Sequence, residues 1–391
     1  MKFEEIKQQE KQNVMPTYGR FDVALVSGKG ATAVDVEGKE YIDFTSGIGV
    51  NCLGYSDPKW ADAVARQAAT LQHISNLYYS PVATQLAETL CKLSGFSKVF
   101  FGNSGAEANE CAIKVAREYS MKKYGAERSE IITLKNSFHG RTLTTLTATG
   151  QEVFHQHFLP LTPGFSYAEP NMWSLTKQVT DKTCAVLIEL IQGEGGVLPV
   201  DKVFVQELSA FCREKDILLL IDEVQTGVGR TGALYCFQNY GIQPDVISSA
   251  KGLGGGLPIG ACLCTEKLAD VLGPGLHGST FGGNPVVCAG ALAVLERMQE
   301  PGFLDSVKEK GAYMAQKLRS MDGIESVRGM GMMLGAALSG GKSAKAVAAS
   351  CVQNGLLVLT AKDVLRFLPP LTITMEELDR GLAILQKTIN Q

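Results

Sequence analysis

Short, fully apolar runs alternate with longer amphipathic stretches through the middle of the chain. We expect strands at 98–101, 131–134, 185–191, 217–221 and 245–249, and helices at 107–124 and 203–215. Strands that are apolar on both faces and alternate with helices are typical of an α/β fold with a mostly parallel central sheet covered by helices. Ligands in such folds bind beyond the carboxyl ends of the strands. The residues that follow each strand are therefore the first candidates for chemistry.

The pattern changes near residue 285 and indicates a second, smaller domain. Helical patterns at 285–299 and 302–321 precede an expected strand at 327–338, a helix at 344–354, a strand at 356–359 and a last helix at 376–390. The first part of the chain holds only short strand patterns at 33–36 and 40–44, too few to fold alone. Because 391 residues exceed one core of usual size, we predict a large domain over 50–281. An α+β domain would combine both chain ends, 1–49 and 282–391.

Composition and charge argue against several kinds of partner. A formal net charge of -3 without a long basic cluster does not suit nucleic-acid binding. No apolar run reaches the roughly 18 residues of a membrane span, and residues 1–16 lack the apolar core of a secretion signal. The ten cysteines lack paired spacing, as in reduced cytoplasmic proteins, and of the five histidines only His155 and His157 lie close together. We therefore expect a cytoplasmic protein without a metal site.

Lys251 is a candidate functional amine. It follows the apolar strand pattern and precedes a glycine-rich stretch, 252–256, where the backbone can approach a ligand closely. A crowded lysine loses part of its affinity for the proton, and a neutral amine forms Schiff bases with aldehydes. Most lysines are simply solvated, so this hypothesis depends on the partners that the rest of the chain supplies.

Two other strand ends offer such partners. After the strand at 98–101, Ser104 begins a helix whose free N–H groups would suit a phosphate. Ser104 and Glu107 also fit an ordinary capping box, so both interpretations stay open. Asp222 ends the apolar run 217–221. It either caps a turn or, ionised at the floor of a crevice, holds a cation such as a protonated ring nitrogen.

Two glycine-rich segments resemble nucleotide-binding motifs but lack their context. Gly227 to Gly232 matches G-x-G-x-x-G, yet the stretch 233–241 that follows is too short for a crossover helix. Gly341-Lys342-Ser343 looks like the end of a P-loop, but Ala336 stands where the first glycine is required. We predict no nucleotide site at either segment.

Five motifs in a fixed order resemble those of one enzyme family. They are Ser104-Gly105-Ala106, Phe138-His139-Gly140-Arg141, Asp222-Glu223-Val224-Gln225, Lys251-Gly252 and Ser279-Thr280-Phe281-Gly282-Gly283-Asn284-Pro285. In order and spacing they resemble the class III, fold-type I aminotransferases, which depend on pyridoxal 5'-phosphate (PLP). The resemblance extends from about Tyr18 to the C-terminus.

The resemblance implies a set of cofactor-binding residues. Lys251 would bind the aldehyde of PLP as a Schiff base and then carry a proton between substrate and cofactor. Asp222 would keep the ring nitrogen of PLP protonated, so that the ring can draw electrons from the substrate. Phe138 and Val224 would cover the two faces of the ring. The remaining cofactor-binding residues would be Ser104, Gly105 and Ala106 at the phosphate, Gln225 near the phenolic oxygen, and Glu223.

The resemblance also implies how substrates and subunits meet. Arg141 would bind a substrate carboxylate with its planar guanidinium group, assisted by Ser279. Thr280 would reach the PLP phosphate of the neighbouring subunit, which predicts a homodimer with shared active sites. Glu194 would mask Arg366 while an ω-amine donor is bound and move away when a dicarboxylate needs a second cation. The plainer alternatives are a structural ion pair for Arg366 and a turn residue for Glu194.

Within the class, 191–196 and 75–79 look most like the acetylornithine aminotransferases. This implies transfer of the side-chain amino group of N2-acetyl-L-ornithine to 2-oxoglutarate, which gives N-acetyl-L-glutamate 5-semialdehyde and L-glutamate in arginine biosynthesis. The alternatives are another ω-aminotransferase, with ornithine, succinylornithine or 4-aminobutyrate as donor, or a non-catalytic PLP-fold binding protein. A non-catalytic protein should lack the lysine or the ring aspartate, and this chain has both.

Overall fold

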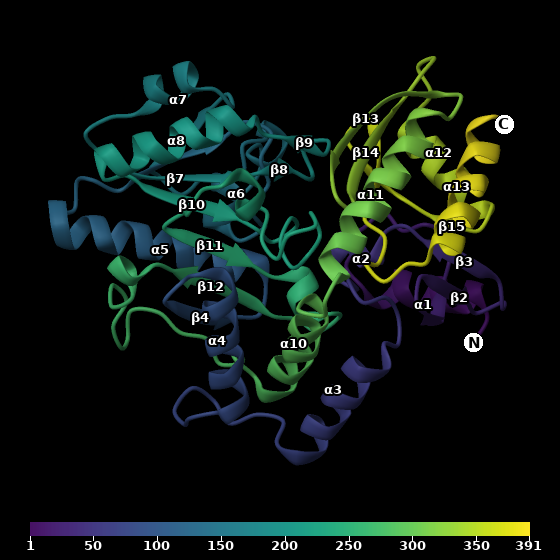
Figure 1. Cartoon of the computed structure of the whole chain (residues 1–391), viewed down its shortest axis with the longest axis horizontal. Coiled ribbons are helices and arrows are strands. Elements are labelled where there is room, and N and C mark those ends of the chain that lie inside the picture. Colours follow the sequence, from purple (N-terminus) through teal and green to yellow (C-terminus); the bar gives the residue numbers. More distant parts are fainter.

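The computed structural model describes residues 1–391 and shows two bodies side by side. The middle of the chain forms the body on the left of Figure 1, while the purple N-terminal and yellow C-terminal segments meet on the right. None of the helices is long and apolar enough to span a bilayer.

The helices and strands have these bounds. The helices are α1 (Phe3–Asn13), α2 (Ser46–Gly49), α3 (Pro58–Thr70), α4 (Pro81–Ser94), α5 (Gly105–Tyr124), α6 (Leu143–Ala148), η1 (Glu152–Phe154), α7 (Met172–Gln178), α8 (Lys202–Lys215), α9 (Phe237–Tyr240), η2 (Lys251–Gly254), η3 (Glu266–Leu268), α10 (Pro285–Met298), α11 (Phe303–Arg319), α12 (Ala344–Gln353) and α13 (Met375–Ile389). The strands are β1 (Leu25–Lys29), β2 (Thr32–Asp35), β3 (Glu40–Asp43), β4 (Lys98–Gly102), β5 (Glu130–Leu134), β6 (Phe165–Ala168), β7 (Thr183–Glu189), β8 (Ile191–Gln192), β9 (Leu198–Pro199), β10 (Leu218–Asp222), β11 (Val246–Ser249), β12 (Gly260–Cys264), β13 (Ile324–Met330), β14 (Met333–Leu338), β15 (Leu356–Leu357), β16 (Leu359–Ala361) and β17 (Val364–Phe367).

A seven-stranded sheet in the order β4-β12-β11-β10-β7-β5-β6 forms the centre of the larger body. The strands are parallel except β12, which runs antiparallel to both β11 and β4. This confirms the predicted α/β fold with a mostly parallel sheet.

Alternate residues of these strands belong to two separate apolar clusters, one on each face of the sheet. Leu219 and Ile221 of β10 pack in a cluster of 68 buried residues that includes Phe204 of α8. Leu218 and Leu220 pack in a second cluster with α5. Because both faces are covered, the strands are apolar at every position, which explains the uninterrupted runs in the sequence.

The smaller body contains two further sheets. Their orders are β1-β2-β3-β15 and β13-β14-β17-β16. The first joins the two ends of the chain, because β15 pairs in parallel with β3 and Leu356 lies opposite Ile42. This agrees with an α+β body made from both ends, while the boundaries at 50 and 281 stay a prediction.

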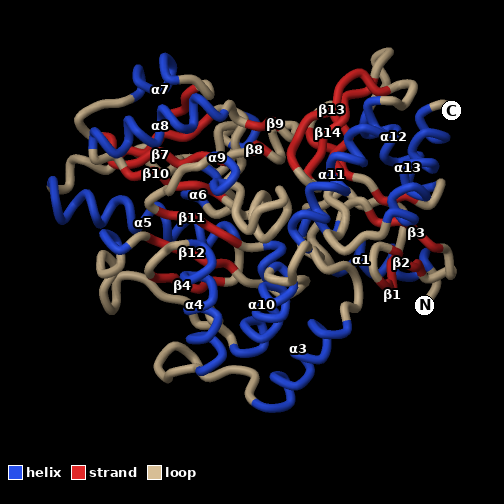
Figure 2. Tube along the Cα trace, viewed as in Figure 1, coloured by secondary structure: helices blue, strands red, loops and turns tan.

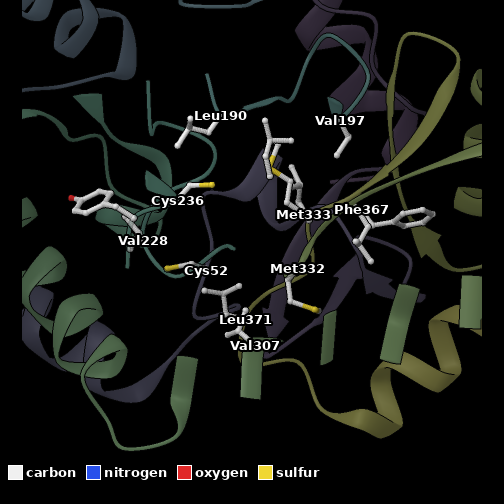
Figure 3. Packing of buried hydrophobic residues seen from close by; sticks show 14 of the residues in the cluster. Cys52, Leu190, Val197, Val228, Cys236, Val307, Met332, Met333, Phe367 and Leu371 are labelled. Carbon is white, nitrogen blue, oxygen red and sulfur yellow. The ribbon is translucent and has the colours of Figure 1, made fainter. Parts of the chain in front are cut away.

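Apolar packing continues from the large sheet into the smaller body. The 68-residue cluster includes Leu190 and Val228 from the middle of the chain as well as Met332, Phe367 and Leu371 from its end. Figure 3 shows these side chains at the junction of the segments. Because close-packed side chains transmit small displacements, this shared core fixes the distance between residues of the two bodies.

Two predicted strands were wrong in extent. The range 327–338 is not one strand but the hairpin β13–β14, which turns at Gly331, where φ is +56°. A glycine at this φ favours a turn, and that signal was not used. The range 356–359 likewise divides into β15 and β16, which belong to different sheets.

The two glycine-rich segments that resemble nucleotide motifs have structural positions. Gly227 to Gly232 lies in the loop between β10 and the four-residue helix α9. Ser343 caps α12, since its hydroxyl accepts a hydrogen bond from the N–H of Ala346.

Candidate active site

A cavity of about 380 Å³ opens beyond the carboxyl ends of β4, β10 and β11. Figure 2 shows loops, in tan, in the region between the large sheet and the smaller body. The cavity is lined by Val50, Asn103, Ser104, Gly105, Ala106, Asn109, Phe138, His139, Gly140, Glu189, Asp222, Val224, Gln225, Ala250, Lys251, Gly256, Leu257, Pro258 and Ile259. The sheet therefore brings together side chains from six separate parts of the sequence, as its topology predicts.

Asp222 forms the floor of the cavity at the end of β10. Its Oδ2 accepts a hydrogen bond from Nδ2 of Asn109 at 2.8 Å and lies 2.9 Å from Nδ1 of His139. Its Oδ1 accepts from the backbone N–H of Val224 at 3.0 Å. The carboxylate is 4% exposed, and these contacts hold it in one orientation. A fixed, buried carboxylate in a cavity suits a cation placed above it.

Lys251 follows Ala250 at the end of β11 and begins the short helix η2. Its backbone has φ of +44°, a region that non-glycine residues rarely adopt and that the surrounding structure must hold in place. Burial lowers the pKa of the Lys251 amine below its ordinary value, the charges of Glu194 and Asp222 oppose this shift, and Arg366 adds to it. A lowered pKa makes the neutral, nucleophilic amine more available.

The N-terminus of α5 forms a second wall. Ser104 accepts a hydrogen bond from the N–H of Glu107 at 3.2 Å, and the Glu107 carboxylate accepts from the N–H of Asn103. Ser104 therefore caps α5, but the predicted capping box is incomplete, because the Glu107 carboxylate accepts from the N–H of Asn103 and not from that of Ser104. The same turn lines the cavity, and the first N–H groups of a helix have no partner within it. Capping and anion binding are thus compatible at this turn.

Phe138 and Val224 line the cavity as well. The backbone N–H of Phe138 donates to Oε2 of Glu189 at 2.9 Å, which fixes the start of its loop. Val224 packs against the N-terminus of α5 so closely that a Cβ at Gly105 would lie 2.7 Å from Cγ1 of Val224. Only glycine therefore fits at position 105 without displacing Val224.

Glu194 and Arg366 form an ion pair beside the cavity. Nη1 of Arg366 donates to Oε1 of Glu194 at 2.5 Å and to Oε1 of Gln225 at 3.2 Å. The Arg366 side chain is 3% exposed and that of Glu194 is 31% exposed. Burial alone would raise the pKa of Glu194, but the adjacent guanidinium group keeps it below its ordinary value. The pair thus joins a fixed, buried cation to a more accessible carboxylate.

Six predicted residues lie outside the cavity lining: Glu194 and Arg366, Glu223, and the three described next. Arg141 is exposed, and its guanidinium carbon lies 4.4 Å from the ring centre of Phe154 and 5.5 Å from that of Phe138. Ser279 accepts hydrogen bonds from Nδ2 of Asn103 at 3.1 Å and from the N–H of Gly282 at 2.9 Å. Thr280 is exposed and does not line the cavity of its own chain.

Glu223, predicted to bind the cofactor, does not line the cavity. Its carboxylate accepts from the hydroxyl of Thr226 at 2.5 Å and from the N–H of Phe237 at 2.8 Å, and the residue is fully buried away from the cavity. Successive side chains of a strand point to opposite faces, so Asp222 and Glu223 diverge at the end of β10. We therefore withdraw Glu223 from the cofactor-binding residues.

Of the cavity residues to which the sequence analysis gave no role, three make hydrogen bonds that fix the site. Asn109 and His139 contact Asp222, and Glu189 accepts from the N–H groups of Phe138 and Gly193. Burial raises the pKa of Glu189 well above its ordinary value, and the charge of Asp222 adds to this effect. A single carboxylate in the otherwise apolar run 185–191 was a usable signal for Glu189. No spacing rule indicated Asn109.

Comparisons with known proteins decide the family. The profile of the family "Aminotransferase class-III" matches residues 14–389. The chain belongs to this family. It is 48% identical to the acetylornithine aminotransferase of Haemophilus ducreyi, with complete coverage of both chains. It is 47% identical to that of Aquifex aeolicus, over 96% of this chain and 99% of the relative.

Solved structures agree with this membership. The ornithine aminotransferase of Toxoplasma gondii ME49 superposes with a TM-score of 0.95 at 31% identity, and 100% of this chain and 95% of that chain are covered. The acetylornithine aminotransferase of Elizabethkingia anophelis gives a TM-score of 0.88 at 32% identity, over 100% and 99% of the two chains.

The residues of the cavity fit PLP, on which this family of aminotransferases depends. A T. gondii ornithine aminotransferase structure, at 31% identity, is described with partial occupancy of PLP at its active site. Here the cavity offers an amine for an aldehyde, a buried carboxylate for a ring nitrogen and a helix N-terminus for a phosphate. When bound, PLP supplies a ring that withdraws electrons from the substrate carbon. The chain is thus a PLP-dependent aminotransferase.

Proposed function

We propose that this aminotransferase moves the side-chain amino group of N2-acetyl-L-ornithine to 2-oxoglutarate. The products are N-acetyl-L-glutamate 5-semialdehyde and L-glutamate, and the reaction serves arginine biosynthesis in the cytoplasm. Relatives at 42–48% identity are named acetylornithine aminotransferases. Within the site, the ion pair of Glu194 and Arg366 carries the proposal.

The ion pair suits two substrates that differ by one carboxylate near the reacting carbon. The donor reacts through its side-chain amine, so the reacting end carries no carboxylate. While Glu194 is paired with Arg366, its carboxylate neutralises the buried guanidinium group. The uncharged end of the donor can then lie beside it. 2-Oxoglutarate brings a carboxylate to this position, and it can replace Glu194 on the guanidinium group. Because Glu194 is partly exposed, its side chain has space to move away.

Arg141 supplies the other cation. It has no carboxylate within salt-bridge distance and lies at the aromatic rings of Phe138 and Phe154. A free guanidinium group held over aromatic rings can receive a substrate carboxylate with two parallel hydrogen bonds. Donor and acceptor would share Arg141 and differ in their use of Arg366.

Two residues would carry the chemistry. Lys251 would accept a proton from the substrate carbon on Nζ and return it at the cofactor side, a role for which a lowered pKa is suitable. Asp222 would keep a positive charge on the ring nitrogen, because its carboxylate is buried and held by Asn109, His139 and the N–H of Val224.

An assay of four donors with 2-oxoglutarate tests the proposal. N2-acetylornithine, ornithine, succinylornithine and 4-aminobutyrate would be compared by kcat/KM under identical conditions. We expect N2-acetylornithine to be the best donor or equal to succinylornithine. If ornithine or 4-aminobutyrate exceeded it by about tenfold, a difference of about 1.4 kcal/mol in barrier, the proposed donor would be wrong.

We also propose that the enzyme is a homodimer with shared active sites. Leu77, Tyr78, Tyr79 and Phe281 are large apolar residues with exposures of 86%, 72%, 100% and 61%. Nδ2 of Asn76 donates to the carbonyl groups of Ser279 and Gly282, so these residues lie on two loops that are tied together. Contiguous exposed apolar side chains favour an interface with a second copy.

Mixed dimers test whether Thr280 acts across the interface. Lys251→Ala and Thr280→Ala chains would be combined at limiting PLP. A mixed dimer would contain one site with both native residues if Thr280 serves the partner subunit, so activity should rise above that of either variant alone. No gain on mixing, or a monomer in light scattering, would refute the shared site.

A further inference from the structure

Two arginines lie in register across the sheet β13-β14-β17. Gly335 of β14 pairs with Arg366 of β17 on one side and with Arg328 of β13 on the other. Residues opposite one another on neighbouring strands point to the same face of a sheet. The row Arg328-Gly335-Arg366 therefore presents two long cations that flank a position without a side chain.

The turn that carries Glu194 lies on this row. Arg366 binds the Glu194 carboxylate at 2.5 Å, and Nε of Arg328 donates to the backbone carbonyl of Gly196 at 2.7 Å. A Cβ at Gly335 would lie 2.9 Å from Cβ of Val197. Val197 is fully buried and belongs to the apolar cluster that also contains Met333 and Phe367 (Figure 3). One arginine thus contacts the side chain of the turn and the other its backbone.

The backbone of this turn requires such support. Val197 has φ of +54° and Gly196 has φ of +118°. A β-branched residue with positive φ persists only where the surroundings enforce it. The bond from Arg328 and the flat surface at Gly335 supply this constraint from the smaller body.

We propose that Arg328 is a positioning residue that anchors the Glu194 turn, so that the enzyme exchanges substrates by moving the Glu194 side chain alone. Arg328 would thereby set the preference between an ω-amine donor and a dicarboxylate. This inference rests on the proposed function of the Glu194–Arg366 pair, but it concerns a residue that lies outside the cavity lining.

The expected effect follows from preorganisation. An anchored turn returns Glu194 to Arg366 after each turnover without loss of further conformational freedom. A loosened turn leaves Arg366 unmasked for a larger fraction of the time. Dicarboxylates should then bind more tightly, while the ω-amine donor, which needs the masked cation, should react more slowly.

Three variants test the anchor in two independent ways. Arg328→Met keeps a long side chain without an N–H donor, Arg328→Lys retains a charged donor, and Gly335→Ala places a methyl group against Val197. Arg319→Met is the matched control, since Arg319 is exposed and lies at the end of α11 outside the site. Thermal unfolding would verify that each variant is folded.

Two measurements are made on each holoenzyme. The first is the single-turnover kcat/KM for N2-acetylornithine relative to that for glutamate, both of which react with the same PLP form. The second is the Kd of glutarate, an unreactive dicarboxylate, by calorimetry. For Arg328→Met and Gly335→Ala we expect the ratio to fall and glutarate affinity to rise by about 3–10-fold, the range of one net hydrogen bond. Arg328→Lys should lie between them and the native enzyme, and Arg319→Met should be unchanged.

Each outcome has a distinct meaning. Equal losses with both amino donors and unchanged glutarate binding would indicate a merely structural arginine and overturn the proposal. An unchanged ratio together with unchanged affinity in folded variants would do the same. If the native enzyme failed to use N2-acetylornithine, the proposed donor would be refuted, but glutarate affinity would still decide the role of Arg328.

Discussion

Asp222 and His139 lie 2.9 Å apart, between Oδ2 and Nδ1, and their exposed fractions are only 4% and 2%. Asn109 joins the same group, because its Nδ2 donates both to Asp222 and to the carbonyl of His139. The carboxylate at the cavity floor is therefore one part of a buried polar network, and such networks act as a unit.

Replacing Asp222 by Ala should raise the activation barrier by about 1.4–4 kcal/mol. A carboxylate within hydrogen-bonding reach of a ring nitrogen raises the pKa of that nitrogen by roughly 1–3 units, and this effect would be lost.

His139→Phe should lower kcat/KM by about 10–100-fold, because a hydrogen bond to a charged group contributes about 1.5–3 kcal/mol. The double variant supplies the control. If His139 acts through Asp222, adding His139→Phe to Asp222→Ala should cost almost nothing further, and additive losses would contradict this coupling.

Lys251→Ala should abolish turnover while PLP still binds without a covalent bond. The remaining contacts of the cavity, including the N-terminus of α5 and Asp222, do not depend on the lysine. Borohydride reduction followed by peptide mapping should label Lys251 in the native enzyme and no residue in the variant. Lys177→Ala, a change at a lysine that lies over the exposed Trp173, should leave both results unaltered. Normal turnover of the Lys251 variant would remove it from the mechanism.

Arg366→Ala should separate the two half-reactions. The variant would lack the contact between the Arg366 guanidinium group and a carboxylate of 2-oxoglutarate. Loss of a bidentate charged contact of about 2 kcal/mol should raise the KM for 2-oxoglutarate by about 30-fold or more. The reaction with the ω-amine donor should change less, because that donor meets a neutralised cation. Stopped-flow spectra of each half-reaction measure both effects. Equal damage to the two halves would favour the plainer interpretation of Arg366 as a structural ion pair.

Glu223 predicts a pH dependence of stability. Burial raises the pKa of the Glu223 carboxyl to about 7, although hydrogen bonds from Thr226 and from the backbone act in the opposite direction. The ordinary value is 4.5, so between these values the folded protein binds more protons than the unfolded chain, and stability falls as the pH rises through this range. Glu223→Gln should lack this loss. Relative to the native protein it should gain up to about 3 kcal/mol between pH 5 and pH 8 in urea unfolding. A constant difference across this range would contradict the raised pKa.

The sequence predicted five of the seven strands of the central sheet, because burial on both faces leaves a continuous apolar run, while β6 and β12 were not predicted. It also predicted which strand ends carry chemistry, since Ser104, Asp222 and Lys251 all line one cavity. Outside the sheet, the helices at 285–299, 302–321, 344–354 and 376–390 were predicted as α10, α11, α12 and α13, but α3 and α4 were missed. Helices α3 and α4 begin at Asp57-Pro58 and Ser80-Pro81, where a capping side chain precedes a proline, a local signal that was available.

Other features were beyond sequence reasoning for a physical reason. The pleat at the end of β10 decides whether the Glu223 side chain points to the cavity or to the core. A shift of one residue along the strand would reverse this direction. The register of Arg328 with Arg366 depends on two strand pairings that no local pattern encodes. Contacts of this kind arise from tertiary packing alone.

Because β3 pairs with β15, the sheet that begins with β1, β2 and β3 cannot be completed until a segment near the C-terminus has been synthesised. During synthesis the larger body can complete its sheet while β1, β2 and β3 still lack their neighbour, because Ile42 pairs with Leu356. Contacts of such long sequence separation form slowly, and an unpaired strand edge invites association with other chains. Loss of the C-terminal segment would therefore remove part of the shared apolar core and leave β3 with an unpaired edge that other chains could bind.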